Sequence, residues 1–271
     1  MVMADSNLLQ QLVNEIKKKP KYARVSEDII RRIGEQQLQK RSSMKETIKA
    51  TLSKLHQIGG AFLEHQPDFN EWSNELKDLP FDPHAPETQE FCLKKMKEHA
   101  STNERLPYLT DFYQTCLKPI SPVQSILDLG CGIHPLAIPW MPLSSDPMYL
   151  GMDIFEDMTD FDRRFLQHIH LRGQVLCKDF LGALPRQKFQ LALALKIIPL
   201  VDQISRPLTR PWLESIPASH ILLTFPKFSL GLKNKGMPDH YSERLDQLIT
   251  GSNWKVESFE FPAELTFLLH R

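Results

Sequence analysis

The residues best placed to do chemistry in this chain surround a glycine-containing turn near its middle. The turn reads Asp128-Leu-Gly-Cys-Gly132, with a short apolar run before it and a second apolar run after it. A buried strand that ends in such a turn brings the backbone close to a ligand, because glycine has no side chain in the way. We interpret the turn as part of a nucleotide-like binding site, although an ordinary tight turn has the same G-x-G pattern.

Two carboxylates at the ends of the next two expected strands extend this candidate site. Asp153 lies 21 residues beyond Gly132, where a carboxylate can accept hydrogen bonds from two ribose hydroxyls. Asp179 ends the following strand, where it can accept from an adenine amino group. Each carboxylate alone could instead cap a helix. Three such features at consecutive strand ends favour an adenosine-containing ligand.

The spacing of the turn indicates which adenosine cofactor it suits. A dinucleotide fingerprint needs a third glycine, and Pro135 stands at that position. S-adenosyl-L-methionine has no pyrophosphate to place on a helix N-terminus. The sequence therefore favours S-adenosyl-L-methionine over NAD or FAD.

Short apolar strands alternate with helical or loop segments from Val123 onward. Strands are expected over 125–129, 149–154, 174–178, 189–195, 221–225, 255–261 and 264–269. Only Pro262 and Ala263 separate the last two, so these strands must pair antiparallel. The pattern predicts an α/β fold, a Rossmann-like class I methyltransferase with a mostly parallel seven-stranded sheet and one antiparallel strand.

The first part of the chain has a helical texture. Helices are expected over 6–19, from a Ser26 cap through Ile33, over 43–58 with Gly59-Gly60 as the stop, and then over 72–79, 87–100 and 103–117. We predict an all-helical module with a linker over 1–84. The domain over 85–271 would then begin with a helical lead-in over 85–120.

Charge is unevenly distributed although the net charge is zero. Residues 1–60 hold twelve Lys/Arg against six Asp/Glu, and residues 61–110 hold five against ten. The basic first segment favours an anionic partner such as nucleic acid, and a solvated helical face is the alternative. The four cysteines are scattered, which supports neither a metal site nor a disulfide framework. Without an apolar signal core or membrane span, a cytoplasmic protein is expected.

Five blocks of the chain together resemble the aminoglycoside-resistance 16S rRNA methyltransferases of the Arm/Rmt/Sgm type. The blocks are His99-Ala-Ser-Thr-Asn-Glu-Arg-Leu106, Asp128-Leu-Gly-Cys-Gly-Ile-His-Pro-Leu-Ala137, Leu195-Lys-Ile-Ile-Pro-Leu200, the 225–231 segment with Lys235-Gly-Met237 and Tyr241, and Lys21-Tyr22 with Asp28 and Arg31-Arg32-Ile33. The resemblance runs from about residue 10 to the C-terminus. It implies a 16S rRNA (guanine(1405)-N(7))-methyltransferase that uses S-adenosyl-L-methionine, releases S-adenosyl-L-homocysteine and confers aminoglycoside resistance.

The resemblance also assigns roles to residues. The implied cofactor-binding set is Phe62, His99, Ala100, Ser101, Arg105, Gly130, Asp153, Asp179, Phe180 and Lys196. The implied substrate-positioning set is Lys196, Phe228, Lys235 and Tyr241. The candidate RNA contacts are Lys17, Lys18, Lys19, Lys21, Arg24, Arg31, Arg32, Lys227, Lys233 and Lys235. Arg105 would hold the methionine carboxylate, and a surface ion pair is its alternative role.

The implied partner is the small ribosomal subunit, bound by a monomer, with no DNA, membrane or metal involved. The helices over 10–58 would dock on rRNA by shape and phosphate contacts. Removing residues 1–60 is then expected to abolish rRNA methylation while leaving cofactor binding largely intact.

One residue departs from the family pattern. The family's Asn before Pro-Leu-Ala is His134 here. Guanine N7 carries no hydrogen, so its methylation needs no general base, and a catalytic role for His134 is disfavoured. His134 is either tolerated or marks altered substrate geometry.

Three other functions stay open on the sequence alone. The chain could methylate a neighbouring decoding-site base. It could act on a small molecule or a protein, with the helical module as a lid. It could also bind the cofactor without catalysis, which the intact substrate-side block disfavours.

Overall fold

A seven-stranded sheet forms the centre of the larger part of the molecule. The computed structural model describes residues 6–64, 67–227 and 237–271, except for the side chains of 60–64 and 237–239. The strands are β1 Val123–Leu129, β2 Leu143–Asp153, β3 Arg172–Cys177, β4 Phe189–Leu195, β5 Ala218–Pro226, β6 Lys255–Glu260 and β7 Glu264–His270. Their order in the sheet is β3-β2-β1-β4-β5-β7-β6.

The predicted strands and their pairing are confirmed. The first five strands are mutually parallel, and β7 runs antiparallel to both β5 and β6. β4 and β7 lie inside the sheet and are buried along most of their length. Their buried side chains include Phe189, Leu191, Leu193 and Leu268. β2 begins six residues earlier than predicted, at Leu143.

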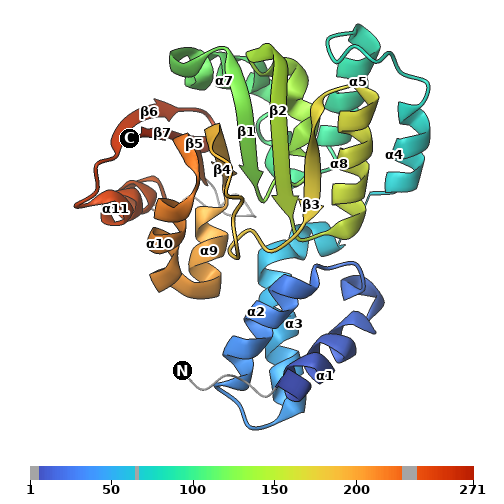
Figure 1. Cartoon of the computed structure of the whole chain (residues 1–271), viewed down its shortest axis with the longest axis vertical. Helices are drawn as coiled ribbons and strands as arrows, with labels where there is room; N and C mark the ends of the chain where they lie inside the picture. Colours follow the sequence, from blue (N-terminus) through green and yellow to red (C-terminus); the bar gives the residue numbers. More distant parts are fainter. Residues whose placement is uncertain (1–5, 65–66, 228–236) are drawn as a thin grey trace.

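Helices flank the sheet at its faces and at its carboxyl edge. On the β3 side lie α4 Phe69–Leu76, α5 Pro86–Met96 and α8 Glu156–His168. Near β1 lie α7 Leu109–Leu117 and the 3-10 segment η4 His134–Trp140. On the β4–β5 side lie α9 Ile198–Ser205, η5 Arg206–Leu208, α10 Thr209–Ser215 and α11 Met237–Ile249 (Figure 1). Phe69 and Trp72 of α4 contact the ring of Phe161 on α8. Residues of α4 therefore pack on α8 of the sheet domain.

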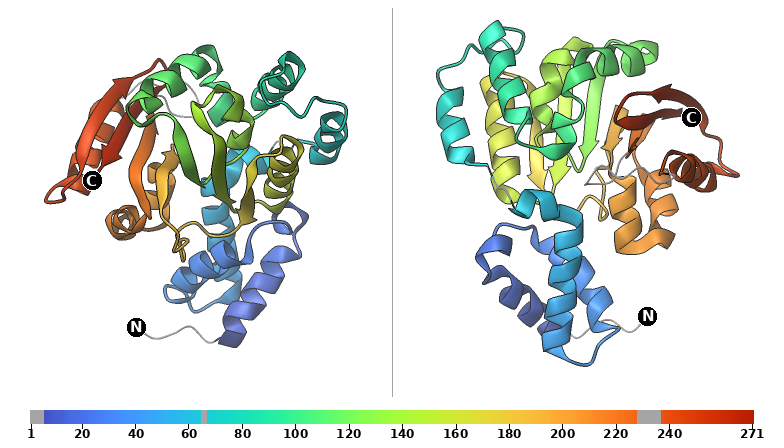
Figure 2. Two further views of the ribbon diagram at one scale, coloured as in Figure 1. Left: turned by 45° about the horizontal axis from the view of Figure 1, so that its top comes forward. Right: turned by 180° about the vertical axis from the view of Figure 1, so that it is seen from behind.

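The first three helices form a separate bundle below the sheet. They are α1 Ser6–Lys17, α2 Glu27–Leu38 and α3 Met44–Glu64, with the short η1 Pro20–Tyr22 between α1 and α2 (Figure 1, Figure 2). Leu12, Ile16, Ile30 and Leu55 fill the bundle's core. The first part of the chain is helical, as the predicted fold class requires, and the division into domains at residue 84 stays a prediction. We call α1–α3 the helical module.

The predicted stop of α3 at Gly59-Gly60 is wrong, since the helix continues to Glu64. A Cβ at Gly59 would come 2.4 Å from Cζ of Phe155. Glycine in a helix interior costs roughly 1 kcal/mol relative to alanine. Here it allows α3 to approach Phe155 closely, so it serves packing rather than termination.

The predicted helices over 87–100 and 103–117 are also interrupted. The first ends at Met96, because His99 takes an extended conformation before the short α6 Ala100–Asn103. Pro107 lies in η2 Leu106–Tyr108, and α7 begins only at Leu109. Proline lacks an N–H and clashes with the preceding turn, which explains the break.

The helical module is attached directly to the sheet domain. Val25 forms an isolated β-bridge with Phe155, and the Ser26 N–H donates to the carbonyl of Ile154 at 2.7 Å. Lys54 of α3 donates to the carbonyl of Gln203 at 3.0 Å. The carboxyl ends of β1 and β2 point toward this module (Figure 1). Among the described helices, none is both long and apolar enough to span a bilayer.

Candidate active site

The glycine turn after β1 has the backbone geometry that only glycine adopts readily. Gly130 and Gly132 have φ values of 66° and 55°. A Cβ on Gly130 would lie 2.5 Å from Cδ1 of Ile197. A Cβ on Gly132 would lie 3.3 Å from Cε1 of His99. The turn therefore brings the His99 block and the segment after β4 against the end of β1.

Asp153 lies beside this turn, as its position in the sequence predicts. The Gly132 N–H donates to its Oδ2 at 2.9 Å, and the Ile154 N–H donates to its Oδ1 at 2.6 Å. Burial raises the pKa of Asp153 to about 6, although these backbone donors act to lower it. A buried carboxylate with remaining acceptor capacity suits a sugar diol.

Asp179 and Phe180 lie at the next strand end, and both side chains are buried. The Leu181 N–H donates to Oδ1 of Asp179 at 2.9 Å. The phenyl Cε1 of Phe180 is 3.6 Å from the Cβ position of Gly130. The structure thus brings the predicted turn, ribose carboxylate and adenine carboxylate to one edge of the sheet.

Arg32 is placed differently from its predicted role in RNA binding. Its Nε donates to Oδ2 of Asp179, across 147 residues of sequence. Its side chain is 27% exposed, against 4% for Asp179. Arg32 therefore belongs to the rim of the candidate cofactor site.

The His99 block lines the same edge. The Nδ1 atom of His99 is buried without a hydrogen-bond partner in the part of the chain that the structure describes. Burial lowers the pKa of His99 to about 4, and the positive charges of Lys196 and Arg105 act in the same direction. The ring is therefore neutral at pH 7. Ala100 is exposed at the start of α6.

Lys196 follows β4 in a left-handed conformation, with a φ of 57°. Its N–H donates to the carbonyl and the hydroxyl oxygen of Thr224, both at 3.0 Å. Its ammonium pairs with Glu104 and lies 3.5 Å from the carbonyl oxygen of Ser101. Strained backbone of this kind persists where surrounding contacts hold it, often at functional sites. Lys196 joins the His99 block to the end of β4.

Arg105 is buried, so the alternative of a surface ion pair is wrong. Its Nε and Nη2 donate to the two carboxylate oxygens of Glu264 at 2.7 and 2.8 Å. The guanidinium carbon also lies 4.6 Å from the ring centroid of Phe112. Burial alone would raise the pKa of Glu264, but the charge and hydrogen bonds of Arg105 hold it below its usual value.

Sequence reasoning missed Glu264 as a site residue. The only local signal is a glutamate at the start of an apolar strand, which by itself indicates a strand edge. The pair spans 159 residues and joins the residue before η2 to β7. It fixes the guanidinium that the resemblance assigns to a cofactor carboxylate.

His134 is the centre of a buried polar network. Its Nδ1 lies 2.5 Å from Oδ2 of Asp128, and its Nε2 contacts the hydroxyl of Tyr113. The Tyr149 hydroxyl donates to the same Asp128 oxygen at 2.5 Å. The imidazole therefore ties η4 and α7 to the end of β1, and Asp128 also holds β2 through Tyr149. Both ring nitrogens are engaged with Asp128 and Tyr113, and the expectation that His134 is no catalytic base stays a prediction.

The substrate-side predictions are described only in part. Tyr241 stacks on Phe225, with ring centroids 4.9 Å apart. Lys227 donates to Oε1 of Glu260 at 2.7 Å, so its charge is already paired. Four predicted residues lie outside the described residues or have undescribed side chains: Phe62, Phe228, Lys233 and Lys235.

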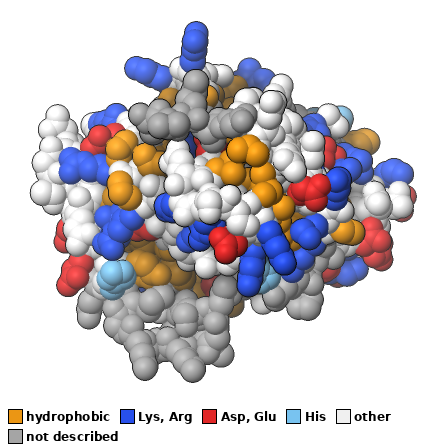
Figure 3. Space-filling model, turned by 90° about the horizontal axis from the view of Figure 1, so that it is seen from below, with side chains coloured by type: hydrophobic (Ala, Val, Ile, Leu, Met, Phe, Trp, Pro, Cys, Tyr) orange, Lys and Arg blue, Asp and Glu red, His pale blue; other side chains and the backbone are white. Residues whose placement is uncertain are grey.

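Several predicted RNA contacts on the helical module are ion-paired. Lys18 pairs with Glu15, Arg24 with Glu156 and Asp157, and Arg31 with Glu27. Within the described ranges, no ion pair is formed by Lys17, Lys19, Lys21, Lys40, Lys45 or Lys49, and all except Lys17 are exposed. Lys and Arg side chains spread over the face seen from below, with Asp and Glu among them (Figure 3). The unpaired lysines are therefore better candidates than the arginines.

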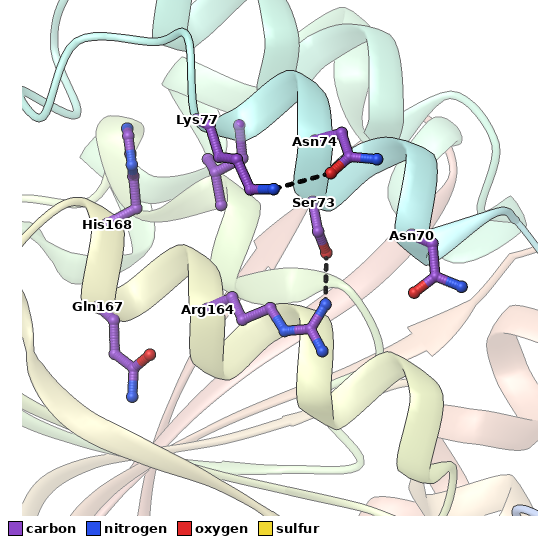
Figure 4. A pocket seen from close by; sticks show the side chains of 8 residues that line it. Asn70, Ser73, Asn74, Lys77, Arg164, Gln167 and His168 are labelled. Atoms are coloured by element: carbon purple, nitrogen blue, oxygen red, sulfur yellow. Dashed lines mark hydrogen bonds between the residues drawn. The ribbon is translucent and has the colours of Figure 1, made fainter.

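A separate polar pocket of about 650 Å³ lies between α4 and the carboxyl-terminal half of α8 (Figure 4). Arg164 donates to the Ser73 hydroxyl at 3.0 Å, and Lys77 donates to Asn74 at 2.9 Å. None of the predicted site residues lines it. Among the described residues, no group of His, Cys, Asp or Glu could hold a metal ion.

Comparisons with known proteins agree with this arrangement. The family model "Ribosomal RNA methyltransferase (FmrO)" matches residues 18–268. A 16S rRNA (guanine(1405)-N(7))-methyltransferase from Micromonospora rosea is 28% identical over 97% of both chains. A protein of the same name from Frankia casuarinae is 30% identical over 93% of this chain and 89% of its own.

Solved structures share the fold. The 16S rRNA methylase RmtB has a TM-score of 0.79 at 22% identity, with all of both chains covered. The 16S rRNA methyltransferase RmtF, solved in complex with S-adenosyl-L-homocysteine, has a TM-score of 0.76 at 23% identity over 99% of this chain and 100% of its own.

Proposed function

The chain belongs to the FmrO family of ribosomal RNA methyltransferases, and from that premise we propose that it methylates N7 of guanine 1405 in 16S rRNA, as its relatives' names state. The methyl donor is S-adenosyl-L-methionine, and the biological outcome is aminoglycoside resistance. One observation carries the proposal. The glycine turn, Asp153, Asp179 and the His99 block converge at the carboxyl edge of the sheet, where parallel α/β folds bind ligands.

The residues at this edge fit such a cofactor. Gly130 and Gly132 let Ile197 and His99 approach the turn closely, and the buried Nδ1 of His99 has no partner among the described residues. Asp153 would accept from the ribose hydroxyls and Asp179 from the adenine amino group. Arg105 would hold the methionine carboxylate, with Glu264 fixing its orientation. Phe180 would pack against the adenine.

When bound there, S-adenosyl-L-methionine supplies an electrophilic methyl group for an in-line displacement by the N7 lone pair. The chain's own residues need not remove a proton, because N7 carries none. Their contribution is proximity and alignment, which accounts for a large part of such accelerations. Lys196, held by Glu104 and Thr224, is well placed to position the target base. Tyr241 would offer a stacking surface to an extruded guanine.

The helical module would dock on the small ribosomal subunit. Its exposed, unpaired lysines suit phosphate contacts, which give no sequence specificity by themselves. Action as a monomer is part of this proposal. The ribosomal substrate named for its relatives supports action in the cytoplasm.

The test is incubation of the protein with unmethylated small subunits and labelled S-adenosyl-L-methionine, followed by mapping of the modified base. We expect label at N7 of guanine 1405 only. Label on a neighbouring decoding-site base would refute the assigned position. Label transferred to a small molecule or a protein, with none on the subunit, would refute rRNA as the substrate.

A further inference from the structure

The helical module contacts the sheet domain directly after Asp153 and at Asp179, the two carboxylates of the candidate cofactor site. Val25, just before α2, bridges to Phe155, two residues after Asp153. The Ser26 N–H donates to Ile154, the residue directly after Asp153, at 2.7 Å. One strand further along the sheet, Arg32 of α2 pairs with Asp179 itself. The module is thus attached at the two points proposed to hold ribose and adenine.

The Arg32 contact fixes the orientation of the Asp179 carboxylate. One carboxylate oxygen is held by the Leu181 N–H, and the other is held by the guanidinium. The backbone at Gly182 folds tightly around this pair, since a Cβ there would lie 3.1 Å from the Asp179 carbonyl oxygen and 3.5 Å from Nη2 of Arg32. A carboxylate accepts about four hydrogen bonds in total. Asp179 therefore keeps capacity for a ligand amino group while its direction is set by α2.

We propose that Arg32 is a positioning residue that couples docking of the helical module on rRNA to cofactor binding, through Asp179. This inference rests on the proposed function. A docked module restrains α2, α2 restrains Arg32, and Arg32 restrains the carboxylate that faces the adenine. Restraint by the first ligand removes an ordering cost for the second, which gives positive cooperativity. The same factor must then raise the affinity of the subunit when the cofactor is bound.

The test measures the dissociation constant of labelled S-adenosyl-L-homocysteine by equilibrium dialysis, with and without saturating small ribosomal subunits. For the wild type, we expect binding at least about fivefold tighter in the presence of subunits, the lower range of common coupling factors. In Arg32→Gln this ratio should fall to about one, because the neutral amide loses the charged fork.

Arg41→Gln is the matched control. Arg41 is also half-buried and bonds to Gln37, a residue of its own helical module. The substitution Arg41→Gln removes the same charge without affecting Asp179. The ratio of its dissociation constants without and with subunits should therefore equal that of the wild type. The coupling would be overturned if Arg32→Gln kept the same ratio of dissociation constants as the wild type. It would also be overturned if the subunits left the dissociation constant of the wild type unchanged.

Arg32→Lys separates positioning from a general structural role. Its ammonium can still pair with Asp179, so we expect a ratio between those of Arg32→Gln and wild type. If the ratio for Arg32→Lys were no higher than that for Arg32→Gln, the Arg32–Asp179 ion pair would not be what transmits the coupling. Thermal unfolding of all variants checks that each one folds. Methyl incorporation by the wild type distinguishes failure of the proposed function from failure of the coupling. Absence of incorporation would refute the proposed function. Loss of the coupling alone would not.

Discussion

At the scale of single residues, buried ionic and polar pairs hold the candidate site in place. Arg105 and Glu264 join elements that are far apart in sequence, and His134 and Asp128 hold η4 against the end of β1. Breaking a buried ion pair by removing one partner leaves an unpaired charge and costs about 3–5 kcal/mol. Loss of the partner of Arg105 should also weaken cofactor binding, because a misplaced guanidinium no longer meets the carboxylate of the ligand.

Glu264→Gln should weaken the binding of S-adenosyl-L-homocysteine by about tenfold or more and lower the melting temperature, because Arg105 loses its bidentate partner. Isothermal titration and thermal unfolding measure both effects. Glu257→Gln, an exposed carboxylate on the adjacent strand of the same hairpin, is the control and should change neither. Unchanged affinity in Glu264→Gln would contradict the role of Glu264 in orienting Arg105.

Asp153 predicts a pH dependence in binding and in stability. Its folded pKa of about 6 is raised above an unfolded value near 3.9. The ionised form is therefore disfavoured by folding, so this group costs stability above pH 6, and the cost is relieved as the pH falls. Ligand affinity should instead fall as the pH falls, because a protonated carboxyl accepts hydrogen bonds poorly.

Titration of S-adenosyl-L-homocysteine between pH 8 and pH 5 should show affinity falling through about pH 6 in the wild type. In Asp153→Asn the affinity should be weaker and should lose this pH dependence. A wild-type curve that is flat across pH 6 would contradict the assignment of the ribose contact to an ionised Asp153.

At the scale of secondary-structure elements, the packing of α3 on Phe155 decides how the helical module meets the sheet domain. The local signal at Gly59-Gly60 indicates a helix end, and the tertiary contact overrides it. The same principle explains the segment over 97–108, where the extended His99 and Pro107 break a periodic helical pattern. His99 thereby contacts the glycine turn, and Arg105 pairs with Glu264.

Gly59→Ala should lower the free energy of unfolding, although alanine is intrinsically a better helix former by about 1 kcal/mol. The new methyl group would lie 2.4 Å from the Phe155 ring, so the rings or the helix must move. Ser53→Ala, at an exposed position of α3, is the control and should be neutral or slightly stabilising. Chemical denaturation measures both changes. A stabilised Gly59→Ala would show that α3 and Phe155 do not pack closely.

At the scale of the whole molecule, the helical module and the sheet domain form a connected unit. Their contacts run through Val25, Ser26, Arg32 and Lys54. The expectation that cofactor binding survives removal of residues 1–60 therefore changes. We now expect such a truncated chain to lose cofactor affinity as well as rRNA methylation, since Asp179 loses Arg32 and Phe155 is uncovered.

Charge reversal on the module surface separates docking from cofactor binding better than truncation does. Lys19→Glu combined with Lys21→Glu should weaken binding to the small subunit and reduce its salt dependence, with a slope of about 0.7 to 0.9 lost per phosphate contact. Cofactor affinity should stay unchanged. Lys77→Glu, at the pocket between α4 and α8, is the control for a change of charge elsewhere. Equal losses in both variants would indicate a general charge effect rather than a docking surface.

The sequence by itself determined much of the fold and the strand ends at which the candidate site lies. Apolar alternation located every strand, and the two-residue gap at Pro262-Ala263 required the hairpin. The positions of Gly130, Asp153 and Asp179 at strand ends were also readable, because parallel strands bring their carboxyl ends to one edge.

Only the tertiary structure decided which charges are available for ligands. Arg32 and Asp179 are 147 residues apart, and Arg105 and Glu264 are 159 apart. A local pattern reports periodicity and turn chemistry within a few residues, whereas a partner at such a distance is chosen by packing. The same reason explains why His134 could be recognised as a departure from the family pattern, while its place in a buried network with Asp128, Tyr113 and Tyr149 could not.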